Sequence, residues 1–312
     1  MADYPDTVDV VEMLPRDGFQ RYDEFVPTEE KIEIIDRLAT TGVSEIEVTS
    51  FTHPKMVPTL RDAEDVVAGI DRRDDVTYRA LVPNVVGMKR ARDAGVDKVN
   101  ALVTVSEEYN RRNQNMTIEE NLEEIGEIVS IADDADITVE AGIGMSFFNP
   151  YQGRTPQEKT LSVVESVLDH GVDEVTLATS MGMANPRQMR SMLAAVYDRW
   201  PAVDLGLHLH DTNGMSLANT LVAMQMGVQR FDSSVCGLGG GVILPKDLEG
   251  IGNTPTEDLV NMLRGMNVET GIDFDRLSAV AEDVRERFDL PATSHVLKGG
   301  TRENVLSTVG DD

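Results

Sequence analysis

Two histidines lie on one side of a segment with strand-like alternation. In Asp204–His210, leucines at 205, 207 and 209 alternate with Gly206, His208 and His210. Side chains of a β-strand alternate between its two faces, so both imidazoles point the same way. Two imidazoles on one face, followed by the carboxylate of Asp211, indicate a metal site. The simpler alternative is a pair of polar residues satisfied within a core.

An arginine and an aspartate stand just past the first strand-like segment. Val8–Leu14 is apolar and β-branched, and Pro15, Arg16 and Asp17 follow it. A guanidinium can stabilise an oxyanion, and a carboxylate can bind a cation. Carboxylate and imidazole ligands together suit Mg²⁺, Mn²⁺ or Zn²⁺. The alternative for Arg16 and Asp17 is a salt bridge within a loop.

Glu47 lies on the inner face of another strand-like segment. It alternates with Ile46 and Val48, which would face the opposite side. A bare buried carboxylate is costly, so we expect Glu47 to pair with Arg16. Asn100 is a weaker inward candidate of the same kind.

A glycine-rich stretch follows the last strand-like segment, between Cys236 and Asn253. Backbone N–H groups at Gly239 and Gly240 could approach an anion or a substrate closely, although a flexible hinge explains the same glycines. Asn253 could supply a fourth oxygen ligand to a metal. Cys236 itself is interpreted as a small buried residue rather than a nucleophile.

The elements that must position these residues alternate along the chain. The strand-like segments are Val8–Leu14, Glu45–Thr49, Thr77–Val82, Lys98–Val103, Ile137–Ile143, Glu174–Ala178, Asp204–His210 and Arg230–Val235. Helical patterns follow them at Glu29–Thr41, Leu60–Gly69, Val85–Ala94, Ile118–Asp134, Pro156–His170, Pro186–Trp200, Gly214–Met226 and Thr256–Met266. Eight β/α units predict a closed (β/α)8 TIM barrel, whose active site lies at the C-terminal strand ends. In such a barrel the eighth strand lies beside both the first and the seventh, which brings Asp17 towards His208 and His210.

A weak internal repeat supports the barrel. Four helical patterns end in Gly-Val, at residues 42–43, 95–96, 171–172 and 227–228, where a glycine can take the left-handed conformation before the next strand. We expect one catalytic domain over residues 1–312, with the barrel at about 8–267 and a short C-terminal helical extension and tail at about 268–312. The extension begins with a helix at Asp275–Arg287, and a mobile tail is expected from about Lys298.

The charge excludes some function classes. The chain has 55 acidic and 28 basic residues, a net charge of −27, so nucleic-acid binding is not expected. We interpret the scattered acids as a halophilic surface adapted to a salty cytosol, with an ordinary acidic protein as the alternative.

No run of about 18 apolar residues exists, so no membrane span is expected. The N-terminus is polar and Cys236 is the single cysteine, so we expect a cytoplasmic protein without an internal disulfide.

Together these motifs resemble the metal-dependent acyl-CoA lyases and synthases of the DRE-TIM superfamily. The resemblance rests on Pro15–Gly18, Glu47–Phe51, His208–Thr212 and Gly237–Gly240, and it extends over about residues 8–290. The most similar branch is 3-hydroxy-3-methylglutaryl-CoA lyase. Further segments similar to that branch are His53–Lys55, Pro83–Asn84, Asn149–Gly153, Ala218–Leu221 and Thr256–Leu259.

The resemblance implies a reaction and a set of roles. The metal ligands would be Asp17, His208, His210 and Asn253, with Mg²⁺ or Mn²⁺ as the ion. The catalytic residues would be Arg16, which stabilises the enolate oxygen, together with Glu47 and His208. Contacts to the acyl-CoA would come from Gly239, Gly240 and Asn113. The reaction would be a retro-Claisen cleavage to acetyl-CoA and a keto product, in leucine degradation, by a homo-oligomer (a dimer or larger).

Two positions depart from that branch. The lyases carry a catalytic cysteine directly after Gly-Leu-Gly-Gly, where this chain has Gly241, and the loop up to Asn253 is about three residues longer here. Thr179 stands where the lyases have an aspartate. Cys236 lies five residues too early to replace the missing thiol in place. The proton donor and the acyl group of the substrate therefore stay open.

Two other functions stay open from sequence. A Claisen-type synthase, similar to isopropylmalate or citramalate synthases, would condense acetyl-CoA with a 2-oxoacid. Such synthases carry a long C-terminal extension and a His-Asn-Asp pattern, whereas this chain has His210-Asp211-Thr212. A non-catalytic relative would explain the missing thiol, but it would have no need to retain Arg16, Asp17 and both histidines.

Overall fold

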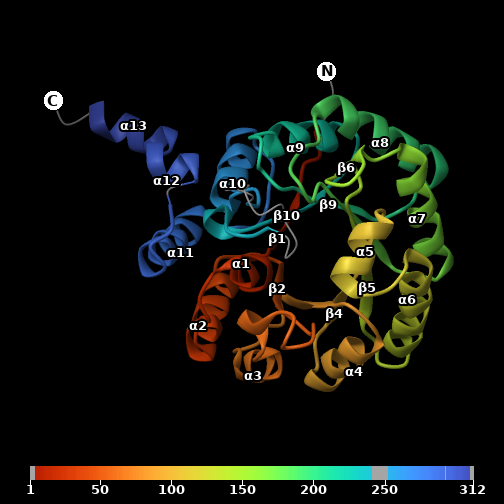
Figure 1. Ribbon diagram of the computed structural model, residues 1–312. Helices are drawn as coiled ribbons and strands as arrows, with labels where there is room; N and C mark the ends of the chain where they lie inside the picture. Colours follow the sequence, from red (N-terminus) through yellow and green to blue (C-terminus); the bar gives the residue numbers. More distant parts are fainter. Residues whose placement is uncertain (1–3, 241–251, 292, 310–312) are drawn as a thin grey trace.

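The strands of the barrel surround a central axis, and helices surround the strands (Figure 1). The computed structural model describes residues 4–291 except 241–251, together with residues 293–309. The barrel strands are β1 (Asp9–Glu12), β2 (Glu45–Ser50), β3 (Thr77–Val82), β4 (Lys98–Thr104), β5 (Thr138–Gly144), β8 (Glu174–Ala178), β9 (Leu205–His208) and β10 (Arg230–Ser233). All their pairings are parallel, and β1 closes the ring between β10 and β2. The predicted TIM barrel is confirmed.

The helices cover the barrel because one face of each is apolar and buried against the strands. They are α2 (Thr28–Ala39), α3 (Ala63–Gly69), α4 (Val85–Ala94), α6 (Ile118–Asp133), α7 (Gln157–Asp169), α8 (Pro186–Arg199), α9 (Ser216–Gln225) and α10 (Thr256–Gly265). The four glycines of the Gly-Val repeat have φ between 81° and 100°, as their place after a helix requires. Capping boxes start α6, at Thr117 and Glu120, and α8, at Asn185 and Gln188.

One helix that matters for the site has no apolar periodicity in sequence. Helix α5 (Glu107–Gln114) is almost wholly polar. Its N-terminus is capped by Ser106, and the ion pairs Glu107–Arg111 (3.0 Å) and Glu108–Arg112 (2.6 Å) each span one turn. Capping and i,i+4 pairs stabilise a helix without a wide buried face. A two-stranded hairpin, β6 (Phe148–Asn149) with β7 (Gly153–Arg154), follows β5.

The C-terminal extension lies outside the ring (Figure 1). Helix α11 (Phe274–Arg287) matches the predicted helix, and it packs on α10 and α2. Two further helices, α12 (His295–Gly299) and α13 (Arg302–Val309), lie next to and within the tail predicted from about Lys298. Residues 302–308 of α13 are exposed, and the mobility of the tail stays a prediction. Ser294 caps α12, and Asp258 accepts hydrogen bonds from the backbone of His295 and Val296, which ties this helix to the barrel.

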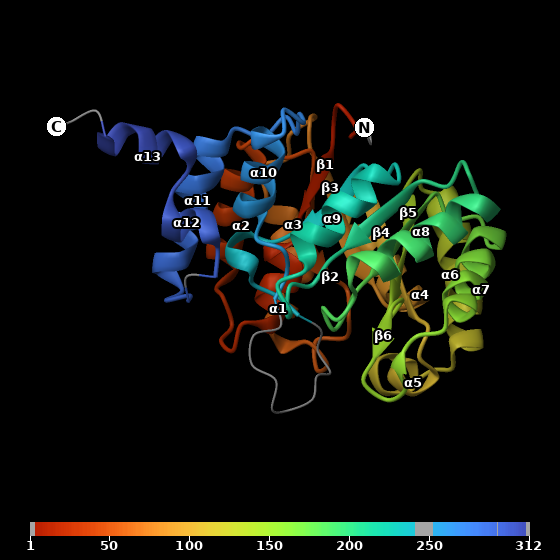
Figure 2. The same cartoon turned by 90° about the horizontal axis from the view of Figure 1, so that it is seen from above.

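The connections that follow the strands gather at one end of the barrel. Helix α5, the hairpin strand β6 and the short helix α1 (Phe19–Arg21) lie at this end, and the N-terminus lies at the other (Figure 2). This is the end at which the active sites of TIM barrels are built. Among the described residues, no helix is long and apolar enough to cross a membrane.

Candidate active site

Arg16 and Asp17 are positioned by a tight turn directly after β1. Residues Leu14–Gly18 form a single wide helical turn, η1, in which the N–H groups of Arg16, Asp17 and Gly18 all lie within 3.3 Å of the Met13 carbonyl oxygen. Wide turns of this kind are frequent at functional sites. The turn buries both side chains, and Nη1 of Arg16 donates to Oδ1 of Asp17 at 2.6 Å. The salt bridge that was the alternative interpretation of Arg16 and Asp17 is present.

Asp17, His208 and His210 meet at one point. One ligand atom from each lies within 4.8 Å of the others, which is close enough to hold one metal ion. The two Nε2 atoms are 2.9 Å apart. Nδ1 of His208 is 3.1 Å from Oδ2 of Asp232, and Nδ1 of His210 is 2.6 Å from the Ser180 carbonyl oxygen. A carbonyl oxygen accepts only, so Nδ1 of His210 carries the proton and its Nε2 lone pair is directed at the shared point.

Asn253 and the glycine-rich stretch hold the other side of Asp17. Nδ2 of Asn253 donates to Oδ2 of Asp17 at 2.7 Å, and the N–H of Gly240 donates to the same oxygen at 3.0 Å. A Cβ added at Gly239 would lie 2.1 Å from Nδ2 of Asn253, so this close approach requires glycine. Oδ1 of Asn253 is buried and has no hydrogen-bond partner among the described residues. An orphaned amide oxygen beside a carboxylate and two imidazoles fits a divalent cation, which accepts oxygen and nitrogen ligands together.

The charges at this point favour the metal-binding protonation states. Burial raises the pKa of Asp17, but the guanidinium of Arg16 and the neighbouring imidazoles outweigh burial and hold that pKa well below its usual range. Burial, and then the neighbouring His208, lower the pKa of His210 to about 4. Asp17 is therefore ionised and His210 neutral near pH 7, which are the forms that bind a metal.

Glu47 lies beneath Arg16 rather than in the cavity. It is fully buried and accepts a hydrogen bond from Nε of Arg16, as expected from sequence. Nδ2 of Asn100 also donates to Glu47, at 3.3 Å. Arg16 and Asn100 line the cavity, whereas Glu47 is not among the described residues that do. Glu47 was predicted to be catalytic, but it has no surface to offer a substrate, so its geometry is that of a residue that positions Arg16.

The point where Asp17, His208 and His210 meet, the metal point, forms part of the wall of a cavity at this end of the barrel. The lining includes Asp17 and both histidines, together with Arg112, Asn113 and Gln114 of α5. Asn113 therefore faces the cavity, and its contact with an acyl-CoA stays a prediction. Gly239 and Gly240, predicted from sequence to contact the acyl-CoA, are not among the described lining residues and instead lie against Asn253 and Asp17.

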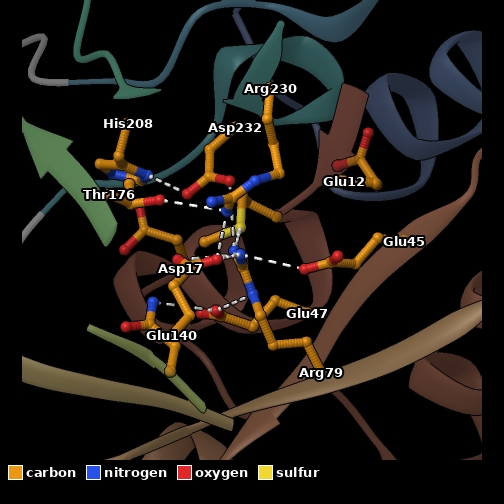
Figure 3. A network of polar contacts seen from close by, with 12 residues as sticks. Glu12, Asp17, Glu45, Glu47, Arg79, Glu140, Thr176, His208, Arg230 and Asp232 are labelled. Carbon is orange, nitrogen blue, oxygen red and sulfur yellow. Dashed lines mark hydrogen bonds and ion pairs between the residues drawn. The ribbon is translucent and has the colours of Figure 1, made fainter. Parts of the chain in front are cut away.

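Two charged residues of the site were not predicted from sequence. Arg79 of β3 is fully buried, and Figure 3 shows it in the middle of a polar network with Asp232 of β10. Nη2 of Arg79 lies 3.2 Å from Oδ1 of Asp232. The available signal was a charged residue directly after a large apolar one in each strand: Arg79 follows Tyr78, and Asp232 follows Phe231. Because strand side chains alternate between faces, this signal could have placed both residues inside the barrel.

Thr179 and Cys236, which bear on the departures from the lyase pattern, both lie within the described residues. Oγ1 of Thr179 accepts a hydrogen bond from the N–H of His210 at 2.9 Å, so this side chain holds the backbone of a candidate metal-binding residue. Cys236 is buried as expected, and its Sγ lies 3.3 Å from the Ala281 carbonyl oxygen of α11, on the helix side. Burial and the nearby Glu257 raise the pKa of this thiol well above its usual range. Gly241 and the loop to residue 251 lie outside the described residues.

Activity is expected to survive loss of the only thiol. Cys236→Ala should retain most of the wild-type rate, and thiol-alkylating reagents should inhibit weakly, because the sulfur faces α11 and is held protonated. The measurement is kcat on the best acyl-CoA substrate, with an unfolding curve to show that the fold is intact. A loss greater than about a hundredfold, the lower end of what a positioned acid contributes, would mean that the thiol acts in proton transfer after all.

Comparison with known proteins matches this chain to one family. The family model described as HMGL-like matches residues 7–284. The chain belongs to this family. It is 39% identical over 295 residues to the hydroxymethylglutaryl-CoA lyase of Bacillus subtilis (strain 168), covering 95% of this chain and 98% of that protein. The crystal structure of the Bacillus subtilis HMG-CoA lyase superposes with a TM-score of 0.91, at 39% identity and with the same coverage. An HMG-CoA lyase from Acinetobacter baumannii, in complex with coenzyme A and 3-methylmalate, superposes with a TM-score of 0.89 at 35% identity, covering 97% of this chain and 98% of that one.

Proposed function

We propose that the protein is a metal-dependent carbon–carbon lyase that cleaves 3-hydroxy-3-methylglutaryl-CoA, or a 3-hydroxyacyl-CoA closely similar to it, by a retro-Claisen reaction. The observation that carries the proposal is the convergence of Asp17, His208 and His210 beside Arg16 in one cavity. In the reaction, the hydroxyl proton leaves and the bond between C2 and C3 breaks. Its electron pair passes to the thioester as an enolate, a ketone forms at C3, and protonation of the enolate gives acetyl-CoA.

The residues of the chain divide this work by position. A divalent ion held by Asp17, His208, His210 and Asn253 would polarise the substrate hydroxyl as a Lewis acid. Arg16 is clamped between two carboxylates and lines the cavity, so its cation is preorganised for the enolate oxygen.

His208 was predicted both as a ligand and as a catalytic residue. One Nε2 lone pair cannot hold an ion and accept a proton at the same moment. The other ring nitrogen of His208 is engaged by Asp232. The ligand role fits this geometry better.

A substrate panel tests the proposed reaction against its alternatives. Purified protein, with Mg²⁺ or Mn²⁺ present, would be incubated with a series of 3-hydroxyacyl-CoAs, and acetyl-CoA release would be followed. Release from the hydroxymethylglutaryl thioester supports the proposal. Consumption of acetyl-CoA with a 2-oxoacid would identify a synthase, and the absence of both reactions would identify a non-catalytic relative. The synthase is disfavoured because the lyases match nearly the whole chain.

Several finer features are part of the same proposal. We infer Mg²⁺ or Mn²⁺ as the ion, a cytoplasmic location, a role in leucine degradation, and a homo-oligomer (a dimer or larger). A competition between Mg²⁺, Mn²⁺ and Zn²⁺ for the metal-free protein, followed by activity, tests the ion. Light scattering tests the oligomeric state.

The acidic surface predicts a dependence on salt. The net charge of −27 repels itself most strongly at low ionic strength, where the screening length is about 30 Å at 0.01 M, against about 3 Å at 1 M. The Tm is therefore expected to rise between low and molar KCl, and activity should rise with it. A thermal unfolding series in KCl measures this. A Tm that does not change over the series would contradict the interpretation of a halophilic surface.

A further inference from the structure

Arg79 is one of the largest fully buried side chains among the described residues, yet the reaction outlined above does not use it. It rises from β3, and its guanidinium lies among four carboxylates (Figure 3). Nη1 lies 3.1 Å from Glu45 and 3.0 Å from Glu140, Nε lies 2.6 Å from Glu47, and Nη2 lies 3.2 Å from Asp232. A cation placed at this depth offsets carboxylates that could not otherwise be buried together.

Two of those carboxylates lead directly to the metal point. One oxygen of Glu47 lies 2.6 Å from Nε of Arg79 as an ion pair, the other accepts a hydrogen bond from Nε of Arg16, and Arg16 in turn donates to Asp17. Asp232 contacts Arg79 through Oδ1, and its Oδ2 is 3.1 Å from Nδ1 of His208. Arg79 therefore stands at the start of two chains of contacts. One ends at the candidate metal ligand His208, and the other runs through Glu47 to Arg16, whose position bears on turnover.

We propose that Arg79 is a positioning residue that sets the geometry of the metal ligands and of Arg16 by holding Glu47 and Asp232 at a fixed separation. The inference deepens the proposed function, and its metal-binding part stands even if the reaction differs. Residues that orient metal ligands from behind typically change metal affinity or activity by about 10–100-fold when they are replaced. Arg79 controls two such residues at once, through a planar guanidinium that lysine cannot imitate.

Arg230 provides a matched control. It is also a buried arginine of the barrel interior, and it pairs with Glu140, Glu174 and Asp204. Within the described part of the chain, Arg230 makes no contact with Glu47 or Asp232. Replacing Arg230 disturbs the same buried charge network without touching either chain of contacts to the metal point.

The test is the binding of Mn²⁺ alone to metal-free protein, measured by calorimetry for wild type, Arg79→Lys and Arg230→Lys. Arg79→Lys is expected to weaken Mn²⁺ binding by about 10–100-fold and to alter the EPR spectrum of bound Mn²⁺. Arg230→Lys is expected to lower Tm while leaving Mn²⁺ affinity and spectrum close to wild type. Steady-state kinetics should show a fall in kcat for Arg79→Lys at saturating metal, with a near-constant KM for the acyl-CoA.

The inference is overturned if Arg79→Lys binds Mn²⁺ as tightly as Arg230→Lys does, because the effect would then be that of any buried cation. Should Arg79→Lys not fold, Asp232→Asn decides. It keeps a side chain of the same shape against His208 but removes the charge that Arg79 holds. Unchanged Mn²⁺ affinity in that variant would equally reject the role. If wild-type protein binds Mn²⁺ but shows no lyase activity, that result would instead reject the proposed function.

Discussion

Removal of the metal is expected to abolish turnover. Asp17 and the imidazoles of His208 and His210 converge within 4.8 Å, and a buried amide oxygen of Asn253 without a partner among the described residues lies beside them, an arrangement that suits a cation. Lewis-acid stabilisation supplies several kcal/mol, so chelation should reduce kcat by on the order of a thousandfold or more. Mg²⁺ or Mn²⁺ added back should restore it.

Metal content must be measured on the sample that is assayed, because a tightly held ion survives simple dialysis. Asp17→Asn is the companion variant: it keeps the shape of the side chain and removes the anionic ligand. It should bind metal more weakly and require a higher metal concentration for activity. A full rate from protein shown by elemental analysis to carry no metal would exclude this mechanism.

Arg16→Lys is expected to lower kcat by about 10²–10³-fold, which corresponds to about 2.7–4 kcal/mol for one preorganised donor. Arg16 binds Glu47 through Nε and Asp17 through Nη1, and this two-sided clamp directs its charge into the cavity. A lysine ammonium is a point charge and cannot make both contacts in that plane. The measurement is kcat and KM on the best substrate.

Because Arg16 also touches a metal ligand, metal content is the necessary control. We expect Arg16→Lys to retain most of its metal, since Asn253 and Gly240 still hold Asp17. Arg230→Lys, a change of the same kind at another buried barrel arginine, should cost far less activity. A near wild-type rate in Arg16→Lys would remove Arg16 from the mechanism.

Local sequence determined the barrel and the metal cluster. Alternation within Asp204–His210 placed both histidines on one face, and the closure of eight β/α units brought Asp17 to them. These inferences succeed because the side-chain direction in a strand depends only on position, and because parallel strand ends share one edge. Helix α5 was missed because capping and ion pairs stabilise it rather than an apolar face.

Tertiary structure alone decided which atoms each polar residue contacts. Glu47 was expected at the reaction centre, but it lies beneath Arg16, and Gly239 was expected at the acyl-CoA, but it packs against Asn253. Arg79 and Asp232 carried no local signal beyond a charge within an alternating strand. Their contacts join strands that are far apart in the chain. Spacing along a sequence specifies the face on which a side chain lies, but not the atom that it meets there.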